Sequence, residues 1–332
     1  MRVALVYNDA KIDEDRAMAE NPHGIEQLRR TVDAVEGGLQ ESGHEVLHLV
    51  LPRYPDLGTI ARSRAEVFFN LTTGIVEKRM QLHAVSLLEM AKVAFVGSDL
   101  LAQSIALDKF VTKVLWSRAS IATPGFQLIP KSGGWEPDPN LRYPAIIKPC
   151  REGSSLGIRA SSVVYSAEQA RRRGNRLRTE FGQNMLLEEL LTGREFTAGF
   201  LGNDPPQIFP IQEIVYGDWP ADEPEIYSFE AKVQEWADRA CPADIEPRLR
   251  HAIEKMCREA VRVLGLRDLA RLDIRLDEEG IPNLLEVNAL PGLQPNYSEY
   301  PRMAAVGGLD YAALMDALVT VAARRGLGGS RA

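Results

Sequence analysis

The chain has 332 residues, which is room for roughly two domains and a sizeable core. Its 39 Lys and Arg are outnumbered by 46 Asp and Glu, and the net charge of −7 disfavours a protein that coats nucleic acid or a membrane surface, because both need basic surfaces. A hydrophobic fraction of 45% and a charged fraction of 26% are those of a globular protein.

Targeting signals and cysteine usage indicate the compartment. The apolar run over residues 3–7 is too short for a signal-peptide core, and no segment approaches the ~20 apolar residues of a membrane span. The cysteines, Cys150, Cys241 and Cys257, are scattered without CxxC spacing and suit reduced thiols. These features predict a cytoplasmic protein with no membrane or nucleic-acid partner.

The first hundred residues alternate between strands and helices. Strands are predicted over 2–7, 44–49, 65–70 and 93–96, and helices over 24–40 and 81–91. This alternation predicts an open parallel sheet covered on both faces. Ligands collect at the carboxyl ends of such strands, so the loop over residues 71–79 is a candidate substrate edge, although a plain connector fits as well.

The next helix, predicted over residues 108–117, carries Lys109 and Lys113 one turn apart on one face. For a lysine pair alone, a solvated helix face is the usual meaning. A Gly/Pro-rich surface loop is predicted over residues 131–140.

A strand over residues 143–149 ends on Lys148 and leads into a Gly/Ser-rich loop, 151–157, and a short strand, 158–160. Backbone N–H groups at glycines, serine hydroxyls and a lysine can together hold phosphate. The loop is not the P-loop motif, and taken alone it is explained better by a simple hairpin turn.

Further along, the pattern predicts these elements in order: a basic helix over 166–180, a strand over 185–191 that runs into a hinge, residues 193–197 and strands to about 211, a helix over 246–264 and a closing helix over 311–324. Residues 212–245 form a long irregular segment, and such segments often act as lids. The tail over residues 326–332 is predicted to be disordered.

A β-hairpin predicted over residues 270–292 carries four polar side chains. Arg271 and Asp273 share one face of its first strand, and Glu286 and Asn288 share one face of its second, because side chains in a strand repeat every two residues. A two-residue turn at Glu279-Gly280 places Asp273 opposite Glu286. Facing carboxylates repel unless a cation lies between them, and a hard divalent cation with oxygen ligands, Asn288 included, would resolve that conflict.

The other face of this hairpin is apolar at Leu272, Ile274, Leu285 and Val287, so both faces are predicted to be buried. Buried carboxylates need partners. This favours a metal site over the alternative, which is an exposed face with solvated acids.

Seven segments, taken together and in order, resemble the motifs of the ATP-grasp carboxylate–amine ligases, and most of all those of the D-alanine–D-alanine ligases. They are Val96-Gly-Ser98, Ala106-Leu-Asp-Lys109, residues 147–157, Glu188-Glu189 with residues 193–196, residues 227–232, Arg271-Leu-Asp273 and residues 286–292. Each motif alone is weak, but the ordered series is a specific signature.

The resemblance implies an α/β plus α+β fold, in which an N-terminal parallel-sheet domain is followed by a two-lobed ATP-grasp fold. Its parts would be the N-terminal domain over 1–100, a central lobe with the glycine-rich phosphate loop over 101–184, and a C-terminal lobe with the metal site over 185–325. It also implies the chemistry. A carboxylate takes the γ-phosphate of ATP to give an acylphosphate, and an amine then displaces phosphate to form an amide.

The resemblance further implies site residues by position. For ATP these are Lys109 and Lys148 at the phosphates, Gly153, Ser154 and Ser155 over the triphosphate, Glu188 with the backbone of Glu189, Leu190 and Leu191 at adenine, and Glu195 at ribose. For catalysis they are Arg271 at the oxyanion, Ser154 near the second substrate and Lys232 as a lid over the phosphates. For two Mg²⁺ ions, or Mn²⁺ as an alternative, they are Asp273, Glu286 and Asn288.

Departures from the family pattern cluster in the segments that bind the substrates. Residues 8–14 offer no clear equivalent of the glutamate that reads the first substrate's amine, and the loop over residues 70–79 lacks the expected histidine. Val233 stands where the family has a tyrosine that bonds to the loop serine. The segment over residues 294–300 is longer and more acidic than the family's Ser-Leu pair.

Candidate substrate residues are Asn70, Gly292, Ser298 and Glu299. Ser298 matches the serine that binds the second substrate's carboxylate, whereas Glu299 would repel a carboxylate and favour an amine-bearing group.

The sequence therefore predicts an ATP- and Mg-dependent ligase that forms an amide between two small amino-acid-like substrates other than two D-alanines. A D-alanine–D-alanine ligase of peptidoglycan synthesis and a non-catalytic ATP-binding regulatory protein are the alternatives. A homodimer is usual in the family.

Overall fold

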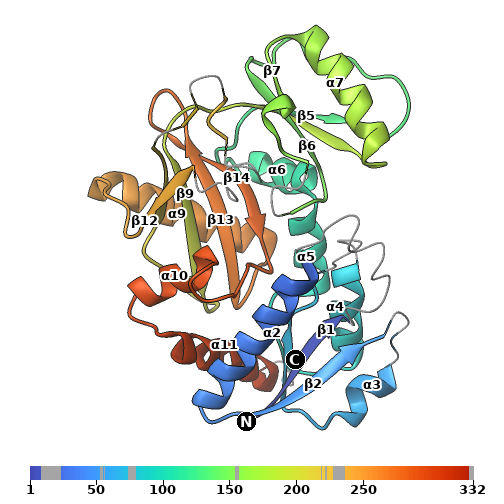
Figure 1. The fold of residues 1–332 in the computed structure, drawn as a ribbon, viewed down its shortest axis with the longest axis vertical. Helices are drawn as coiled ribbons and strands as arrows, with labels where there is room; N and C mark the ends of the chain where they lie inside the picture. Colours follow the sequence, from blue (N-terminus) through green and yellow to red (C-terminus); the bar gives the residue numbers. More distant parts are fainter. Residues whose placement is uncertain are drawn as a thin grey trace.

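The computed structural model describes residues 1–8, 24–52, 55, 57–73, 80–153, 157–217, 219–220, 223–226 and 236–328. The described chain forms three sheets, each with its own helices (Figure 1). In the view of Figure 1 the N-terminal sheet lies at the bottom, the largest sheet in the middle and a small sheet at the top.

The N-terminal sheet is parallel, as predicted. Its strands are β1 (Arg2–Asn8), β2 (Glu45–Leu51), β3 (Val67–Asn70) and β4 (Phe95–Val96), in the order β2-β1-β3-β4. Its helices are α2 (Gly24–Glu41), α3 (Leu57–Arg62) and α4 (Met80–Met90). Helix α2 buries Leu28, Val32, Val35 and Leu39, which recur every three or four residues and so lie on one face.

The small sheet at the top of Figure 1 is antiparallel and carries helix α7 (Ala167–Glu180). Its strands are β5 (Phe126–Ile129), β6 (Ala145–Pro149), β7 (Val163–Val164) and β8 (Met185–Glu189), in the order β5-β8-β6-β7. The strand predicted over residues 158–160 is wrong. A 3-10 turn, η1 (Ala160–Ser162), comes first, and β7 pairs with β6 only from Val163.

The middle sheet has six strands in the order β12-β11-β9-β13-β14, with β10 paired to β9. They are β9 (Glu195–Leu201), β10 (Gln207–Ile208), β11 (Gln212–Tyr216), β12 (Ala237–Ala240), β13 (Leu269–Leu276) and β14 (Pro282–Asn288). The prediction of an irregular segment over residues 212–245 is wrong at both ends, because β11 and β12 pair there. Residues 227–235 lie outside the described part.

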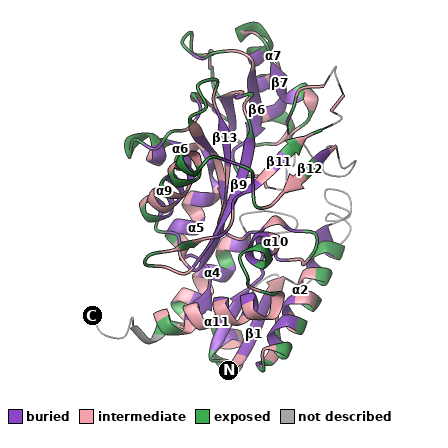
Figure 2. Ribbon diagram, turned by 90° about the vertical axis from the view of Figure 1, so that its left-hand side faces the viewer, coloured by how far each residue is buried: buried purple, intermediate pink, exposed green. Residues whose placement is uncertain are grey.

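Helices cover one face of this middle sheet. They are α5 (Leu100–Leu107), α6 (Lys109–Arg118) and α9 (Pro247–Leu264), and their apolar residues share one core with β9, β13 and β14. Figure 2 shows the buried strands β9 and β13 with α5, α6 and α9 on one side and α10 (Glu299–Val306) on the other. The face that α10 shares is the one that carries the candidate site.

The last helix, α11 (Tyr311–Gly328), packs against the N-terminal sheet although it follows the middle sheet in sequence. Leu314 and Leu318 share a core with Val3 and Leu5 of β1. The predicted disordered tail is wrong for residues 326–328, which are helical, and residues 329–332 lie outside the described part. The chain therefore returns to its starting domain, which a division by sequence order does not indicate.

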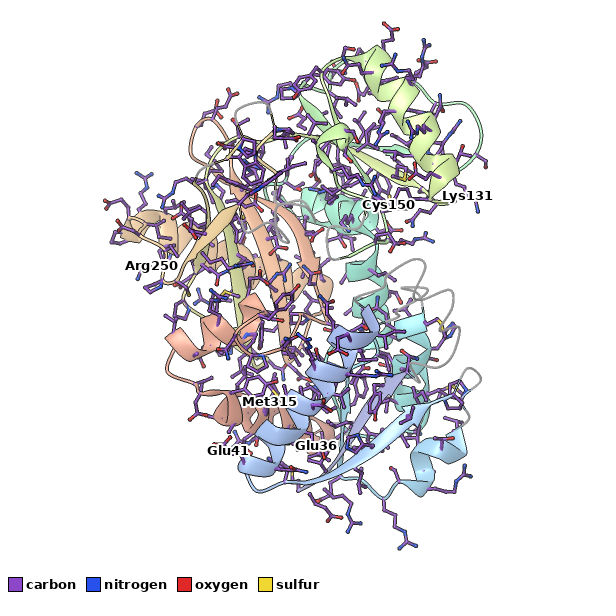
Figure 3. All side chains as sticks on the ribbon, viewed as in Figure 1. Glu36, Glu41, Lys131, Cys150, Arg250 and Met315 are labelled. Carbon is purple, nitrogen blue, oxygen red and sulfur yellow. The ribbon has the colours of Figure 1, made fainter. Side chains whose placement is uncertain are left out.

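Among the described residues no single helix has the length and hydropathy of a membrane span. Helices α10 and α11, the latter counted to Gly326, reach them only when taken together, and they are bent by 101° to each other. All three cysteines are free thiols. Burial raises the pKa of Cys150, which lies where the small sheet meets α6 (Figure 3), and that of Cys257 to about 12, so neither is an activated nucleophile.

Candidate active site

A pocket lies between the small sheet and the middle sheet. Its apolar lining residues are Ile146, Ile158, Leu190, Leu191, Phe196, Ile214, Ile226 and Leu285. Its polar lining residues are Lys148, Glu188, Glu189, Glu195, Thr197, Arg271, Asp273, Arg275, Glu286 and Glu299. Most residues that the sequence predicts for ATP and metal therefore line one pocket.

The apolar part of the pocket has a carboxylate beside it. Ile146 and Ile226 are buried in one cluster, against which Ile158 and Leu190 pack, while Glu188 is 2% exposed. Aliphatic walls with one buried acceptor suit a flat heteroaromatic ring that carries an amino group. The three isoleucines were not predicted, because single isoleucines on separate segments give no sequence signal, whereas Leu190 was predicted for its backbone.

The end of β8 at Glu189 and the next residue, Leu190, also line this pocket. The N–H of Glu189 donates to Gly125 (2.8 Å) and that of Leu190 to Pro144 (2.9 Å), so these two N–H groups are engaged within the protein. A base held at this strand would use the remaining backbone groups, including those of Leu191.

Two lysines contact Glu188 on the floor of the pocket. The Nζ of Lys148 donates to its Oε1 at 2.7 Å, and the Nζ of Lys113 forms an ion pair with its Oε2. Burial disfavours the charge on Glu188, but the two lysines hold the pKa of its carboxyl below the ordinary value. The solvated face expected for Lys109 and Lys113 is wrong, because both are buried, and Lys113 completely so.

Lys109 joins the end of β6 to the hairpin. Its Nζ donates to the carbonyl of Glu152 and lies 3.4 Å from Oε2 of Glu286, while its N–H donates to Cys150 (3.0 Å). The start of α6 thus holds the loop that follows Lys148. Of the predicted loop residues, Gly153 is described, whereas Ser154, Ser155 and the lid residue Lys232 lie outside the described residues.

The hairpin of β13 and β14 has the predicted register at its functional end. Asp273 pairs with Glu286, and Arg271 pairs with Asn288. The predicted two-residue turn at Glu279-Gly280 is wrong, because the ladder instead ends at Leu276 and Pro282. The longer loop shifts the register by one residue, and a β-bulge on β14, opposite the step from Asp273 to Ile274, shifts it back.

Leu285 is the extra residue of this bulge. The ladder passes from Leu284, opposite Ile274, directly to Glu286, opposite Asp273. Leu284 is fully buried in the core, and Leu285 lines the pocket beside Glu286. The expectation that Leu285 packs on the apolar face is wrong, because the bulge turns it to the site.

The carboxylate of Asp273 accepts hydrogen bonds from three residues. Arg271 donates to it with two N–H groups, Nε to Oδ1 (2.9 Å) and Nη2 to Oδ2 (2.8 Å). The hydroxyl of Thr197 donates to Oδ1 (2.7 Å) and the amide of Asn288 to Oδ2 (3.3 Å). Burial opposes the charge of Arg271, but Asp273 and Glu299 raise its pKa above the ordinary value, so it stays a guanidinium.

The predicted metal ligands fit a hard cation by their chemistry. Asp273 and Glu286 face each other and Asn288 adds an amide, so the donors are oxygens, which Mg²⁺ prefers. Within the described residues no cluster of three or more His, Cys, Asp or Glu is arranged to hold a metal. A cation here would therefore complete its ligands with phosphate oxygens and water, as is usual for Mg²⁺.

Glu195 lies at the side of the pocket. It accepts from the hydroxyl of Tyr216 (2.5 Å) and lies 3.4 Å from Nη1 of Arg275. Arg275 and Thr197 line the pocket and were not predicted. Arg275 could have been predicted from the sequence, because it continues the alternation of Arg271 and Asp273 along the strand.

The candidate substrate residues divide into two places. Asn70 ends β3, is 3% exposed, and accepts from the hydroxyl of Thr72 (2.6 Å), so it lies at the carboxyl edge of the N-terminal sheet. Ser298 precedes α10, and its Oγ lies 2.6 Å from where a Cβ on Gly292 would be, so a side chain at position 292 would require Ser298 to move.

Glu299 begins α10 and lines the pocket. Its Oε2 lies 3.4 Å from Nη1 of Arg271, and its Oε1 lies 3.7 Å from Nε of Arg239. Two guanidinium groups therefore offset its charge, which the sequence did not indicate.

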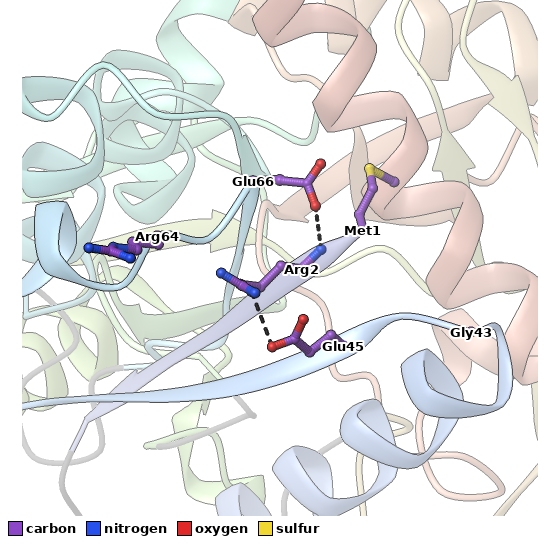
Figure 4. A pocket seen from close by; sticks show the side chains of 6 residues that line it. All are labelled: Met1, Arg2, Gly43, Glu45, Arg64 and Glu66. Carbon is purple, nitrogen blue, oxygen red and sulfur yellow. Dashed lines mark hydrogen bonds and ion pairs between the residues drawn. The ribbon is translucent and has the colours of Figure 1, made fainter.

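A second hollow lies on the N-terminal domain and is lined by Met1, Arg2, Gly43, Glu45, Arg64 and Glu66 (Figure 4). Arg2 lies 3.1 Å from Glu45 through its Nε and donates its N–H to Glu66 at 2.6 Å. This hollow is at the amino ends of β1 and β2, the edge opposite to that where ligands collect in parallel sheets. We assign it no part in the site.

The fold is that of an ATP-grasp ligase, and comparisons with known proteins identify the family. The family described as "D-ala D-ala ligase C-terminus" matches residues 115–320. The uncharacterized protein y4sG of Sinorhizobium fredii is 32% identical over 99% of this chain and 98% of its own length. The vancomycin B-type resistance protein VanB of Enterococcus faecalis is 34% identical over 72% of this chain and 68% of its own.

A D-alanine–D-alanine ligase of Alcanivorax borkumensis is 31% identical over 73% of each chain. The structure of a D-alanine–D-alanine ligase from Bacillus anthracis complexed with ATP has a TM-score of 0.75 at 18% identity and covers 99% of both chains, which is a likeness of fold. The chain belongs to the D-alanine–D-alanine ligase family and is an ATP-dependent, ADP-forming ligase.

Proposed function

We propose that this ligase joins the carboxylate of one amino-acid-like substrate to the amine of a second, with Mg²⁺ as its metal. The observation that carries the proposal is the pairing of Asp273 with Glu286 on one pocket floor, beside the cations of Lys109, Lys148 and Arg271. Phosphoryl transfer needs carboxylates that bind a metal cation and cationic side chains that neutralise the phosphate oxygens.

The proposed reaction has two steps. A carboxylate oxygen of the first substrate attacks the γ-phosphorus of ATP, the bond to ADP breaks, and an acylphosphate forms. The amine of the second substrate then attacks the acyl carbon, phosphate leaves, and the amine nitrogen loses a proton. The products are an amide, ADP and phosphate.

The candidate site residues take distinct roles in these steps. Lys109 and Lys148 neutralise charge on the phosphates, and Arg271 donates to the oxyanion that forms when the amine attacks. Asp273, Glu286 and Asn288 hold Mg²⁺, which neutralises phosphate oxygens when bound. Ser154 and Lys232 are assigned by family likeness alone, the first near the second substrate and the second as a cover that excludes water.

The nucleotide is proposed to lie with adenine between the apolar side chains of the pocket and its amino group toward Glu188. Ribose hydroxyls would donate to Glu195. The support is the burial of Glu188 beside Ile146 and Ile226, and the position of Glu195 farther along the same pocket.

The substrate pair is proposed to differ from two D-alanines. The support is in the sequence, since the substrate-binding loops at 8–14, 70–79 and 294–300 depart from the family pattern, and in Glu299, a carboxylate that lines the pocket. D-Alanine–D-alanine synthesis is the alternative, since relatives of about one-third identity carry that name. A homodimer and the use of Mn²⁺ stay predictions.

A screen of ATP-dependent phosphate release over pooled D- and L-amino acids, amines and hydroxy acids tests the proposal, with mass spectrometry of the products. We expect a product whose mass is the sum of two substrates minus water. Efficient formation of D-alanyl-D-alanine would overturn the substrate part. ATP binding without Mg-dependent turnover on any substrate would overturn the ligase reaction and favour a regulatory nucleotide-binding role.

A further inference from the structure

We propose that Lys113 is a positioning residue of the nucleotide site, the permanent ion-pair partner of Glu188 that releases Lys148 to the phosphates. The inference rests on the proposed nucleotide site and adds a residue that contacts no substrate. Neither the sequence motifs nor the reaction scheme assign any role to Lys113.

Lys113 is held by three groups of the protein. Its Nζ forms an ion pair with Oε2 of Glu188, contacts Oγ1 of Thr123 at 2.5 Å, and lies 3.3 Å from the carbonyl of Leu284. Two of its N–H groups thus have acceptors in Thr123 and Leu284, and the carboxylate of Glu188 supplies the opposite charge. The side chain is 0% exposed.

The acceptors of Lys113 are themselves fixed. The hydroxyl of Thr123 donates to the carbonyl of Leu284 (2.7 Å), and the N–H of Leu284 donates to Ala122 (2.9 Å). Leu284 is the last regularly paired residue before the bulge that places Glu286. Lys113 is therefore tied to the hairpin and cannot leave Glu188 without breaking contacts on β14.

Lys148 is placed differently. It lines the pocket, is the last residue but one of β6, close to the phosphate loop, and donates at 2.7 Å to Oε1 of the same carboxylate. A triphosphate in the pocket would draw its Nζ away from Glu188, because phosphate carries more charge than a carboxylate. Glu188 would then be a buried carboxylate with one cation fewer, and a buried unpaired charge is strongly unfavourable.

The two lysines thus have different tasks at one carboxylate. Lys113 keeps Glu188 ionised and in place, and Lys148 can exchange Glu188 for phosphate. Without Lys113, every phosphate bond that Lys148 makes would leave Glu188 unpaired. Loss of Lys113 should therefore weaken binding of ATP much more than binding of adenosine, which does not compete for Lys148.

Calorimetric titration of the full chain with ATP and with adenosine tests this, and it needs no knowledge of the substrates. For Lys113→Met we expect the Kd of ATP to rise ~10- to 100-fold, the loss typical of a charged hydrogen bond, and that of adenosine to change less than about threefold. Lys255→Met, on the exposed face of α9, is the matched control and should change neither.

The double variant Lys113→Met/Glu188→Gln provides the rescue. With a neutral amide in place of Glu188, Lys148 no longer has a carboxylate to abandon, so the Kd of ATP relative to that of adenosine should recover toward the ratio of the unaltered chain. The ratio is the readout because both ligands carry the adenine that contacts residue 188. If Lys113→Met does not fold, Thr123→Val, which removes one of the contacts that hold Lys113, is expected to weaken ATP selectively by a smaller factor.

Equal weakening of ATP and adenosine, or no recovery in the double variant, would overturn the inference and leave Lys113 a structural residue. Failure of the unaltered chain to bind ATP at all would instead overturn the proposed nucleotide site. The two failures are distinguished by the titration of the unaltered chain.

Discussion

Glu286 lies directly opposite Asp273 because Leu285 is bulged out of the ladder between β13 and β14. The bulge gives two consecutive residues, Leu285 and Glu286, to the pocket side, where a regular strand would give one. The pocket thereby gains an apolar contact next to a carboxylate.

Leu284 and Leu285 are the same residue type in opposite environments, and they should respond differently to truncation. Leu284→Ala should lower the free energy of unfolding by ~2–5 kcal/mol, because Leu284 is fully buried in the core. Leu285→Ala should change it by less than ~1 kcal/mol but weaken ATP binding a few-fold through lost apolar contact. Urea unfolding and ATP titration of both variants provide the measurements, and equal loss of stability in the two would contradict the bulge.

Asp273 should be needed for turnover rather than for nucleotide binding. Asp273→Asn keeps the shape and its bond from Thr197 but removes the charge that Arg271 and a cation share. We expect Mg-dependent ATP turnover to fall by ~100-fold or more, as for loss of a group that acts in the transition state, with the ATP Kd changed by less than about tenfold.

Glu278→Gln, exposed in the loop of the same hairpin, is the control for Asp273→Asn and should keep full turnover. Near-normal turnover in Asp273→Asn, measured by release of phosphate over a Mg²⁺ series, would reject the assignment of Asp273 to the metal.

ATP affinity should depend on pH through Lys113. Burial lowers the pKa of Lys113 from 10.5 to about 8, against the attraction of Glu188 and Glu286 and with the repulsion of Lys148. Because this pKa falls on folding, the unfolded chain binds more protons between about pH 8 and 10.5, and the contribution of Lys113 to the free energy of unfolding rises with pH in that window.

The effect on ATP has the opposite sign. Above about pH 8 a neutral Lys113 no longer compensates Glu188 when Lys148 turns to phosphate, so the Kd of ATP should rise by about tenfold per pH unit at most. Titrations from pH 6.5 to 9.5 should show this rise in the unaltered chain and a flat profile in Lys113→Met. Parallel profiles in the two proteins would exclude Lys113 as the source.

Strand–helix alternation was sufficient to predict the parallel N-terminal sheet, and period-two alternation placed Asp273 and Glu286 on one face of the hairpin. Their register was predicted from a two-residue turn that is wrong, and it agrees with the structure because the bulge offsets the longer loop. Period-two alternation could not find the bulge, because Leu284 and Leu285 are both apolar and either could face the core. The burial of Lys113 could not be predicted either, because its partner Glu188 is 75 positions away in sequence. Only the fold of the small sheet brings the two side chains together. Local pattern predicts local geometry, and the partners of buried charges are set by tertiary contacts.

Glu299 should determine which acceptor the enzyme takes. Glu299→Leu restores the residue type that follows the carboxylate-binding serine in the family pattern, and it removes the carboxylate that faces Arg271 and Arg239. Their guanidinium groups are then available to an acceptor's carboxylate, so the KM for D-alanine as acceptor should fall by ~10-fold, which is the worth of one charged hydrogen bond. Glu299→Gln, which keeps the shape, should shift the KM in the same direction by less.

Competition between D-alanine and the best acceptor of the screen, read by mass spectrometry of the products, measures the change. If neither variant gains activity with acceptors that carry an α-carboxylate, Glu299 does not select the acceptor, and its contacts serve to orient Arg271.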